Sequence, residues 1–493
     1  MDPQPIPYID LFAGAGGLGE GFSAYSLGNS KIFNAVLSVE NNAEACETLR
    51  LRHFFRQFDK ERVPEAYYAH LQGKFGRGYL FNKYPEEGQK AMDCVLNLTL
   101  ADENRNRLND EIERRIKGHD KWVLLGGPPC QAYSVVGRAR RSGDSEFEND
   151  PKQTLYLQYL YLLDEFAPPV FVMENVQGLL SAKLGKETVL ERIMTYIRNG
   201  MYHYRLYSLG TGEEITSVEE CGKLLVDTSL YGIPQRRKRL FILGIRDDIR
   251  VTPKPLQRCG EITVADAIGD LPAIKSRVSK RKDNDSSDWL SSILAIRKVD
   301  MQGLDPHLVE HVSRRLDELE SGIATTDSRM RRDLTEFHQW IHDARLAVIP
   351  QHEARSHMSS DLRRYFFASA YAEYTGKSPK LADFPAELLP QHKNVACNPA
   401  KTIFNDRFRV QLKNAPSTTI TAHIHKDGHY FIHYDPIQCR SFTVREAARL
   451  QTFPDNYFFE GNKTEQYRQI GNAVPPLFAM KIAEIVHDIL KHA

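Results

Sequence analysis

The sequence lacks any apolar run long enough to cross a membrane, and it shows no secretion signal. None of its 493 residues lies in a run that approaches the roughly 18 apolar residues of a membrane span. Residues 1–7 have neither the basic stretch nor the apolar run of a signal peptide. With 41% hydrophobic and 26% charged residues, the composition is that of a globular protein. We therefore expect a cytoplasmic protein of about three domains, or of two domains with insertions.

Cysteine and net charge are both scarce. The seven cysteines form no CxxC pair and no regular spacing, which argues against a disulfide framework and against a zinc cluster. The 65 Lys and Arg residues stand against 64 Asp and Glu residues. Overall neutrality does not exclude a nucleic acid, because affinity for phosphates depends on local basic clusters. Such clusters lie at Arg138, Arg140 and Arg141, between Lys275 and Lys282, and at Lys401, Arg407, Arg409 and Lys413.

A glycine-rich turn near the N-terminus predicts a site for a nucleoside cofactor. A short apolar strand at residues 8–12 precedes Gly-Ala-Gly-Gly-Leu-Gly at residues 14–19, and a second apolar run ends before Glu40. Glycines let the backbone approach a ligand, and a carboxylate about 20 residues later accepts hydrogen bonds from ribose hydroxyls. A cofactor-free glycine turn and an NAD-dependent oxidoreductase fit this segment as well. Further apolar runs up to about residue 250 predict a parallel α/β sheet.

A lone cysteine follows another predicted strand. The apolar residues 122–125 lead directly into Gly126-Gly127-Pro128-Pro129-Cys130. In an open α/β sheet the carboxyl ends of the strands border the ligand crevice, and two prolines make the chain rigid there. A buried structural cysteine is the ordinary alternative. The basic segment that follows, between Gly137 and Gly143, has the composition of a mobile lid, although a solvated loop explains it equally well.

A carboxylate and a group of arginines are predicted at the same edge of the sheet. Glu174 ends the apolar strand at residues 170–173, where an unpaired carboxylate is costly. A structural ion pair with an arginine is the alternative explanation. Gln235-Arg236-Arg237-Lys238-Arg239 precedes another apolar strand, and strand alternation places Arg237 and Arg239 on one side.

Taken in order, these segments resemble the motifs of the DNA cytosine-5 methyltransferase family. The matching segments are residues 10–17 (Asp-Leu-Phe-Ala-Gly-Ala-Gly-Gly), 127–131 (Gly-Pro-Pro-Cys-Gln), 174–176 (Glu-Asn-Val), 235–239 (Gln-Arg-Arg-Lys-Arg), 445–454 (Arg-Glu-Ala-Ala-Arg-Leu-Gln-Thr-Phe-Pro) and 471–475 (Gly-Asn-Ala-Val-Pro). The resemblance implies an α/β, Rossmann-like S-adenosylmethionine-dependent methyltransferase fold in residues 1–250, completed by residues 456–493. Residues 251–455 would form a separate small target-recognition domain with an insertion.

The resemblance also assigns the chemistry. Cys130, as a thiolate, would add to C6 of cytosine and make C5 nucleophilic toward the methyl group of S-adenosylmethionine. Glu174 would be the acid at N3 and Arg239 would bind O2, while Arg237 would support the thiolate or the backbone. Because C6 is inaccessible inside a duplex, the target base would be flipped into the site, and residues 134–150 would close behind it.

Positions that bind the cofactor and the DNA follow from the same resemblance. The cofactor-binding positions are Asp10, Phe12, Gly14, Ala15, Gly16, Gly17, Glu40, Asn41, Asp102, Pro129, Leu155, Asn472 and Val474. A helix N-cap explains Asp102 equally well. The DNA-binding positions are Gln131, Ser134, Arg138, Arg140, Arg141 and Gln235. No metal site is expected, because the histidines of a hairpin predicted at residues 418–435 have no cysteine beside them.

Three functions remain open from the sequence. The first is methylation of cytosine C5 in a specific duplex DNA sequence, in the cytoplasm of a prokaryote, as part of a restriction-modification or related phage-defence system with cognate partner proteins. The second is cytosine-5 methylation of tRNA by the same core, which the missing Cys-Phe-Thr signature disfavours. The third is a catalytically silent DNA-binding or NAD-linked protein, which the intact Cys130, Glu174 and Arg239 argue against.

Overall fold

The computed structural model describes residues 4–129, 155–184, 187–279, 289–322, 335–391, 402 and 404–493. An eight-stranded sheet lies at the centre, with the order β10-β13-β7-β6-β1-β4-β5 and with β11 also paired to β13. The strands are β1 (Ile6–Leu11), β4 (Phe33–Glu40), β5 (Val95–Asn97), β6 (Val123–Gly126), β7 (Val170–Val176), β10 (Tyr204–Tyr207), β11 (Leu225–Asp227) and β13 (Lys238–Arg246). The strands from β7 to β5 in this order are parallel, whereas β13 runs antiparallel to β7. The predicted α/β fold class is confirmed.

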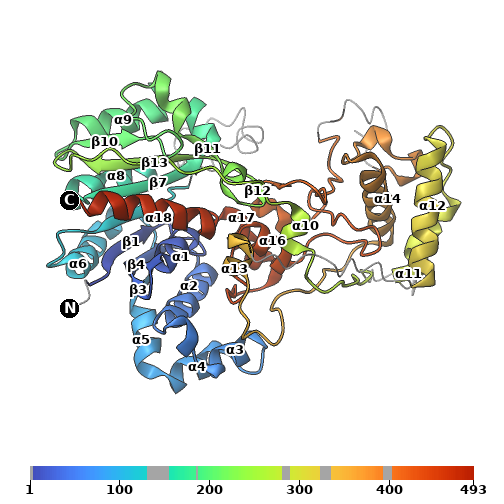
Figure 1. Ribbon diagram of the computed structural model, residues 1–493, viewed down its shortest axis with the longest axis horizontal. Coiled ribbons are helices and arrows are strands. Elements are labelled where there is room, and N and C mark those ends of the chain that lie inside the picture. The colour runs from blue at the N-terminus through green and yellow to red at the C-terminus, as the bar shows by residue number, and fades with distance from the viewer. Residues whose placement is uncertain are drawn as a thin grey trace.

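Both faces of the sheet are covered by helices, because the strands are apolar on both faces. Along β6, Val123 and Leu125 belong to one apolar cluster and Leu124 belongs to the other. The first face is covered by α1 (Gly17–Ala24) and α18 (Pro476–Leu490), the helix shown in red across the front of Figure 1. The second face packs against α6 (Arg105–Ile116), α8 (Leu155–Phe166) and α9 (Val189–Asn199). The strand order reverses between β1 and β6, and ligands of such folds bind at that point.

A group of four helices, which we call the helical insertion, occupies the first part of the long segment between Glu40 and Gly126, ahead of β5 and α6. It consists of α2 (Ala43–Arg56), α3 (Glu65–Leu71), α4 (Arg77–Lys83) and α5 (Pro85–Asp93). Its own apolar cluster includes Phe54, Tyr67 and Leu80, and Leu346 and Phe458 from distant parts of the chain pack against it. The insertion therefore contacts one segment within the predicted recognition region and one segment that follows it.

A second unit is helical and lies apart from the sheet (Figure 1). Its helices are α11 (Trp289–Leu294), α12 (Pro306–Ser321) and α14 (Ser359–Thr375), which share an apolar cluster with residues 408–439. The side chain of Asp305 caps α12, and Gly322 and Gly376 end α12 and α14 with φ angles of 70° and 68°. We call this group of helices the helical unit.

Between α12 and α14 the chain returns to the sheet. We call residues 335–351 the strap, which begins with α13 (Glu336–Ile341). Phe337 and Ile341 are buried in the apolar cluster of the sheet, and the Trp340 indole N–H donates to the carbonyl of Thr452 over 2.7 Å. The same cluster contains residues of α10 (Val264–Ile268), α16 (Val444–Leu450) and α17 (Lys463–Asn472). The two units are therefore joined by several chain crossings.

The hairpin predicted at residues 418–435 is wrong. The short strand β14 (Ser417–Thr418) pairs with β12 (Gln235–Arg236), and a 3-10 helix at Ala422–His425 follows it. The alternating pattern has another origin: Ile424 packs in the core of the sheet, while Ile432 bridges to Val410 and Ser441. None of the described helices is both long and apolar enough to span a bilayer.

Candidate active site

Glu174 and Arg239 form an ion pair at the carboxyl edge of the sheet. Nε of Arg239 lies 3.1 Å from Oε1 of Glu174, and the two side chains are only 16% and 12% exposed. The pair forms because β13 runs antiparallel to β7, which brings Arg239 opposite Val176. Burial lowers the pKa of Arg239, and the Glu174 carboxylate offsets part of this effect. A carboxyl group and a cation side by side can bind a polar ligand at two neighbouring atoms.

The Gly-Pro-Pro segment lies against this pair. The side-chain amide of Asn175 donates to the carbonyl of Pro128 over 3.2 Å, and a Cβ added to Gly127 would lie 3.2 Å from Oε2 of Glu174. Pro129 is the last described residue before Cys130. Sequence reasoning assigned no role to Asn175, and the only signal was its position beside Glu174. The structure indicates that Asn175 positions the segment from which Cys130 continues.

Cys130 and several predicted DNA-binding residues lie outside the described residues. These are Gln131, Ser134, Arg138, Arg140 and Arg141.

Arg237 lies behind the site rather than in it. Its side chain is 1% exposed and donates to the carbonyls of Ile420 and Gly471, over 3.0 Å and 3.4 Å. Burial, together with the nearby Arg239 cation, holds the pKa of Arg237 well below its usual range. This placement agrees with support of the backbone, one of its two predicted roles. We therefore treat Arg237 as a positioning residue and correct its placement among the catalytic residues.

Glu40 holds the glycine turn that follows β1. Its Oε2 accepts from the backbone N–H of Gly14 over 2.9 Å, and its Oε1 accepts from that of Asn42 over 2.8 Å. Gly14 has a φ of 56°, and a Cβ placed on it would meet nothing within 4 Å. The turn is therefore open at Gly14, so that a ligand can approach the backbone beside a fixed carboxylate.

The last motif of the sequence packs directly on this turn. A Cβ on Gly17 would lie 2.2 Å from the carbonyl oxygen of Val474, so only glycine fits there. The hydroxyl of Tyr457 donates to the carbonyl of Ala15. Gly16 has a φ of 76° and faces Leu49. Segments from both ends of the chain thus build one turn, as the predicted return of the chain requires.

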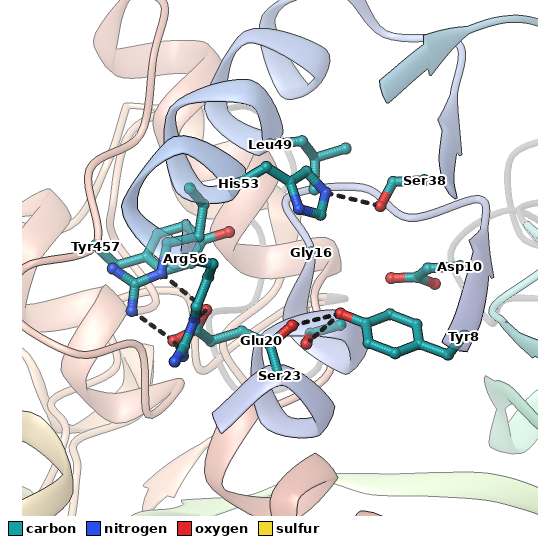
Figure 2. Close-up of a pocket in the computed structure, with 12 residues that line it drawn as sticks. Tyr8, Asp10, Gly16, Glu20, Ser23, Ser38, Leu49, His53, Arg56 and Tyr457 are labelled. Atoms are coloured by element: carbon teal, nitrogen blue, oxygen red, sulfur yellow. Dashed lines mark hydrogen bonds and ion pairs between the residues drawn. The ribbon is translucent and has the colours of Figure 1, made fainter. Parts of the chain in front are cut away.

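Asp10 faces away from the ligand edge, which corrects its assignment to the cofactor. It is 1% exposed and lies with Tyr8 beside a cavity of about 20 Å³ under α1 (Figure 2). Such a cavity has room for little more than one water molecule, far less than a nucleoside. Its Oδ2 has no hydrogen-bond partner among the described groups, and burial raises the pKa of Asp10 to about 7. We infer that Asp10 supports the first turn of α1, where it interacts with the backbone of Gly19.

A charged cluster closes the other end of this cavity. Glu20 is buried and accepts from Nε of Arg52 over 2.8 Å, and Arg56 pairs with the same carboxylate (Figure 2). Although burial alone would raise it, the two guanidinium groups hold the pKa of Glu20 below its usual value. Arg52 also donates to Oδ1 of Asn456 over 2.9 Å, which ties α2 to the C-terminal motif segment.

Asp102 lies on the surface and not at the turn. Its side chain is 75% exposed, pairs with Arg105 at 2.8 Å and accepts from Gln158 over 2.7 Å. The alternative of an N-cap is also wrong, because Ala101 occupies that position. Asn97, which sequence reasoning missed, ends β5 directly opposite Glu40 and is exposed. It is better placed than Asp102 to meet a ligand at the edge.

Gln235 is a core residue, which corrects its assignment to DNA. It is fully buried, its amide donates to the carbonyl of Leu450 over 3.2 Å, and its Oε1 accepts from the N–H of Ile420 over 2.8 Å. The exposed neighbours are instead Arg236 and Lys238. Buried amides of this kind fix the strand β12 against β14.

Three of the remaining cofactor positions, Phe12, Asn41 and Pro129, follow the carboxyl ends of β1, β4 and β6. Phe12, directly after β1, has a φ of 53°, a strained angle for an aromatic residue, and remains partly exposed. Asn41 and Asn472 are exposed, and Pro129 and Leu155 are partly exposed. With the open turn at Gly14 and the carboxylate of Glu40, these residues fit an adenosyl cofactor. The fold and the site thus define an α/β protein with an open glycine turn beside a fixed carboxylate and with a largely buried Glu–Arg pair at the carboxyl edge of its sheet.

Comparison with known proteins agrees with this geometry. A family model described as C-5 cytosine-specific DNA methylase matches residues 97–487. Type II methyltransferase M.Bpa9945I of Bacillus paralicheniformis is 33% identical over 505 aligned residues, covering 98% of this chain and 98% of that protein. Type II methyltransferase M.AgeI of Thalassovita gelatinovora is 27% identical and covers 97% of this chain and 98% of its own length. A crystal structure of a DNA modification methyltransferase encoded within an E. coli prophage matches with a TM-score of 0.54 at 20% identity, covering 99% of both chains.

The chain therefore belongs to the C-5 cytosine-specific DNA methylase family and is a DNA (cytosine-5-)-methyltransferase. The predicted family and enzyme class are confirmed. The prophage enzyme supports the fold alone, because its sequence identity to this chain is low.

Proposed function

We propose that this enzyme methylates C5 of cytosine within a specific duplex DNA sequence and is the modifying member of a prokaryotic restriction-modification system. The single observation that supports this best is the Glu174–Arg239 pair beside the Gly127-Pro128-Pro129 segment, all at the carboxyl edge of the sheet. Relatives over the whole length of the chain are named type II methyltransferases. A cytoplasmic location and a cognate nuclease belong to the same proposal.

The chemical difficulty lies in cytosine itself, since C5 is a weak nucleophile. In our proposal the Cys130 thiolate forms a bond to C6, the electron pair of the C5–C6 double bond shifts to C4–C5, and that of the C4–N3 double bond moves onto N3, so that C5 becomes the nucleophilic carbon of an enamine. Glu174 supplies a proton or hydrogen bond at N3, and Arg239 donates to O2, so the developing negative charge meets two fixed groups. The closing steps remove the C5 proton and expel the Cys130 thiolate, which restores the aromatic ring.

S-adenosylmethionine is the cofactor that we assign to the glycine turn. When bound it would supply a methyl group activated as a sulfonium to C5 of the cytosine, and its sulfur would leave as the neutral thioether of S-adenosylhomocysteine. Glu40 would accept hydrogen bonds from the ribose hydroxyls, Phe12 would stack on the adenine, and the open backbone at Gly14 would admit the methionine part. Asn472 would complete the contacts from the last motif.

The target cytosine must leave the duplex before this chemistry can occur. A base in the stack hides its C6 face, so we propose that the enzyme extrudes the nucleotide into the Glu174–Arg239 site. The unit that follows residue 250 would hold the flanking duplex. Arg236 and Lys238, exposed beside the site, would contact phosphates there.

Methyl transfer from labelled cofactor tests this function directly. The wild-type enzyme should label duplex DNA and leave tRNA unlabelled, and bisulfite sequencing of DNA from expressing cells should map the recognition sequence. Label in tRNA alone would overturn the proposal. Cys130→Ser should abolish turnover and keep cofactor binding, and a serine variant with unchanged rate would refute the assigned nucleophile.

A further inference from the structure

Phe404 combines two features that a residue without a function seldom shows together. Its side chain is 58% exposed, although it is a large aromatic ring. Its φ is 65°, in the left-handed region that side chains of this size rarely occupy. Strain of this kind persists where the surrounding structure enforces it, often at functional sites.

The surrounding structure does enforce this conformation. The carbonyl of Phe404 accepts from the backbone N–H of Arg407 over 3.2 Å, which closes a turn. The carbonyl of Asn405 accepts from the N–H of Leu381 over 2.7 Å, and Phe408 is 2% exposed in the apolar cluster of the helical unit. A rigid turn therefore presents the Phe404 ring to the solvent.

The turn is basic and is connected to the active site. Arg409 pairs with Asp406, whereas no carboxylate among the described residues pairs with Arg407. The segment continues to Gln411, whose Oε1 accepts from the N–H of Thr418 over 2.8 Å in β14. β14 pairs with β12, which ends three residues before Arg239.

We propose that Phe404 is a DNA-contacting residue whose ring stacks on a base of the bound duplex, with Arg407 on the adjacent phosphate. The inference rests on the proposed function. An aromatic face stacks on any base, and an apolar side chain can enter a base step at which the duplex is deformed. A preordered turn loses little entropy on binding, which explains why the strained backbone is retained.

Substitutions at Phe404 can separate the ring from the backbone. Asparagine and glycine both tolerate the left-handed region, so Phe404→Asn and Phe404→Gly remove the ring and keep or relax the turn. Phe404→Tyr keeps an aromatic ring. Met201 is 78% exposed and precedes β10, whose first residues lie at the opposite edge of the sheet from Glu174, so Met201→Asn is the matched control.

The experiment measures the affinity of each variant for a duplex that carries the mapped recognition sequence, by fluorescence anisotropy with S-adenosylhomocysteine present. Phe404→Asn and Phe404→Gly should bind about tenfold more weakly, because loss of one stacked aromatic has an effect of this size. Phe404→Tyr and Met201→Asn should bind as the wild type does. A scan of the duplex with 2-aminopurine should show one position whose fluorescence changes with the wild type and not with Phe404→Asn.

Wild-type affinity in both Phe404→Asn and Phe404→Gly would overturn the inference. If the wild type methylates DNA in the same preparation, that result refutes the role of Phe404 alone. If the wild type transfers no methyl group to DNA, the proposed function itself fails, and the two failures remain distinct. Cofactor affinity, measured in parallel, should be the same in every variant.

Discussion

Buried charged side chains are paired differently at the sheet edge and in the helical unit. At the sheet edge, partners come from distant segments: Glu174 pairs with Arg239 across two strands, and Arg237 binds a carbonyl 234 residues away. In the helical unit, Asp361 pairs with Arg364 and Arg315 with Glu318, each one turn apart on the same helix, although Arg315 also pairs with Glu373 of α14 and with Asp435. Pairs within one helix stabilise that helix wherever it packs, whereas pairs between strands exist only in the finished fold. The ion pair at the sheet edge thus depends entirely on the finished fold, whereas the helical unit combines long-range pairs with pairs that a single helix supplies by itself.

Glu174→Gln should impair the chemistry at the sheet edge, and its effect should be the largest of these substitutions. Glutamine has the same shape and can still accept from Arg239, but it cannot donate an acidic proton to the base. We expect the single-turnover rate of methyl transfer to fall roughly 10²–10⁴-fold, the usual range for a general acid, while the fold survives. Rapid-quench measurement of transfer to duplex DNA checks this.

A surface ion pair offers the control for that variant. Glu187 pairs with Arg192 at 3.3 Å with both side chains well exposed, so Glu187→Gln should leave the rate unchanged. A Glu174→Gln enzyme with the wild-type rate would show that the carboxyl group has no part in the chemistry.

Phe366→Ala should destabilise the helical unit, because it leaves a cavity in the apolar cluster and removes no reactive group. Phe366 is fully buried in the cluster of α11, α12 and α14. Truncation of such a ring costs about 3–5 kcal/mol. We expect the affinity for DNA to fall and the affinity for S-adenosylmethionine to survive, as measured by calorimetry on the same preparation.

Tyr374→Phe on the same helix tests whether this effect is local. Tyr374 is 41% exposed, so its substitution should change the stability by less than about 1 kcal/mol. If Phe366→Ala abolishes cofactor binding as completely as DNA binding, the two regions form one cooperative unit and the comparison fails.

Asp10→Asn should reveal how much the buried Asp10 carboxylate lowers the free energy of unfolding at neutral pH. The carboxyl pKa rises from 3.8 to about 7 on folding, so the folded state holds this proton more tightly than the unfolded state. The cost of a buried charge is therefore absent below about pH 4 and is fully present above about pH 7. Asparagine is neutral throughout, so the stability of the wild type relative to the variant should fall across this window, by at most on the order of 4 kcal/mol.

Urea unfolding at several pH values measures this difference. Asp110→Asn, at an exposed position on α6, is the control and should change the stability by less than about 0.5 kcal/mol throughout. A flat difference between the wild type and Asp10→Asn from pH 4 to pH 8 would contradict the argument.

The sequence pattern predicted those parts of the site that depend only on where the apolar strands end. The carboxyl ends of apolar strands identified Glu174, Glu40 and the Gly-Pro-Pro segment, because parallel strands bring such ends to one edge. Strand alternation also determines that Asp10 shares a face with Tyr8, and Tyr8 belongs to the cluster under α1. This alternation is visible in the sequence, and it places the Asp10 side chain on the face of the sheet under α1, away from the ligand.

Other features depend on partners that no local pattern shows. Gln235 is buried because β12 pairs with β14. Its side-chain amide donates to the carbonyl of Leu450 and accepts from the N–H of Ile420. The alternation of apolar and polar residues near residue 424 predicts a hairpin, but in the structure its apolar residues pack in two different clusters. The sequence predicts a separate domain in residues 251–455 but not its helices, for a similar reason: the buried residues of their shared cluster come from segments between residue 293 and residue 439.

The strap, which lies in the chain between two helices of the helical unit, α12 and α14, packs on the sheet unit, and Tyr68→Phe should weaken its attachment slightly. The hydroxyl of Tyr68 in α3 donates to Oδ2 of Asp343 over 2.9 Å, and the guanidinium of Arg345 lies 4.4 Å from the centre of the Tyr68 ring. Asn456 donates to the same Asp343 oxygen over 2.7 Å, so the carboxylate keeps one partner in the variant. We expect the free energy of unfolding to fall by about 1–2 kcal/mol, and the KM for DNA to rise while kcat stays constant. Tyr79→Phe, in the same insertion with an exposed ring, should change neither quantity. A Tyr68→Phe enzyme that loses stability at unchanged KM would mean that the strap holds the sheet unit together but does not orient the helical unit toward DNA.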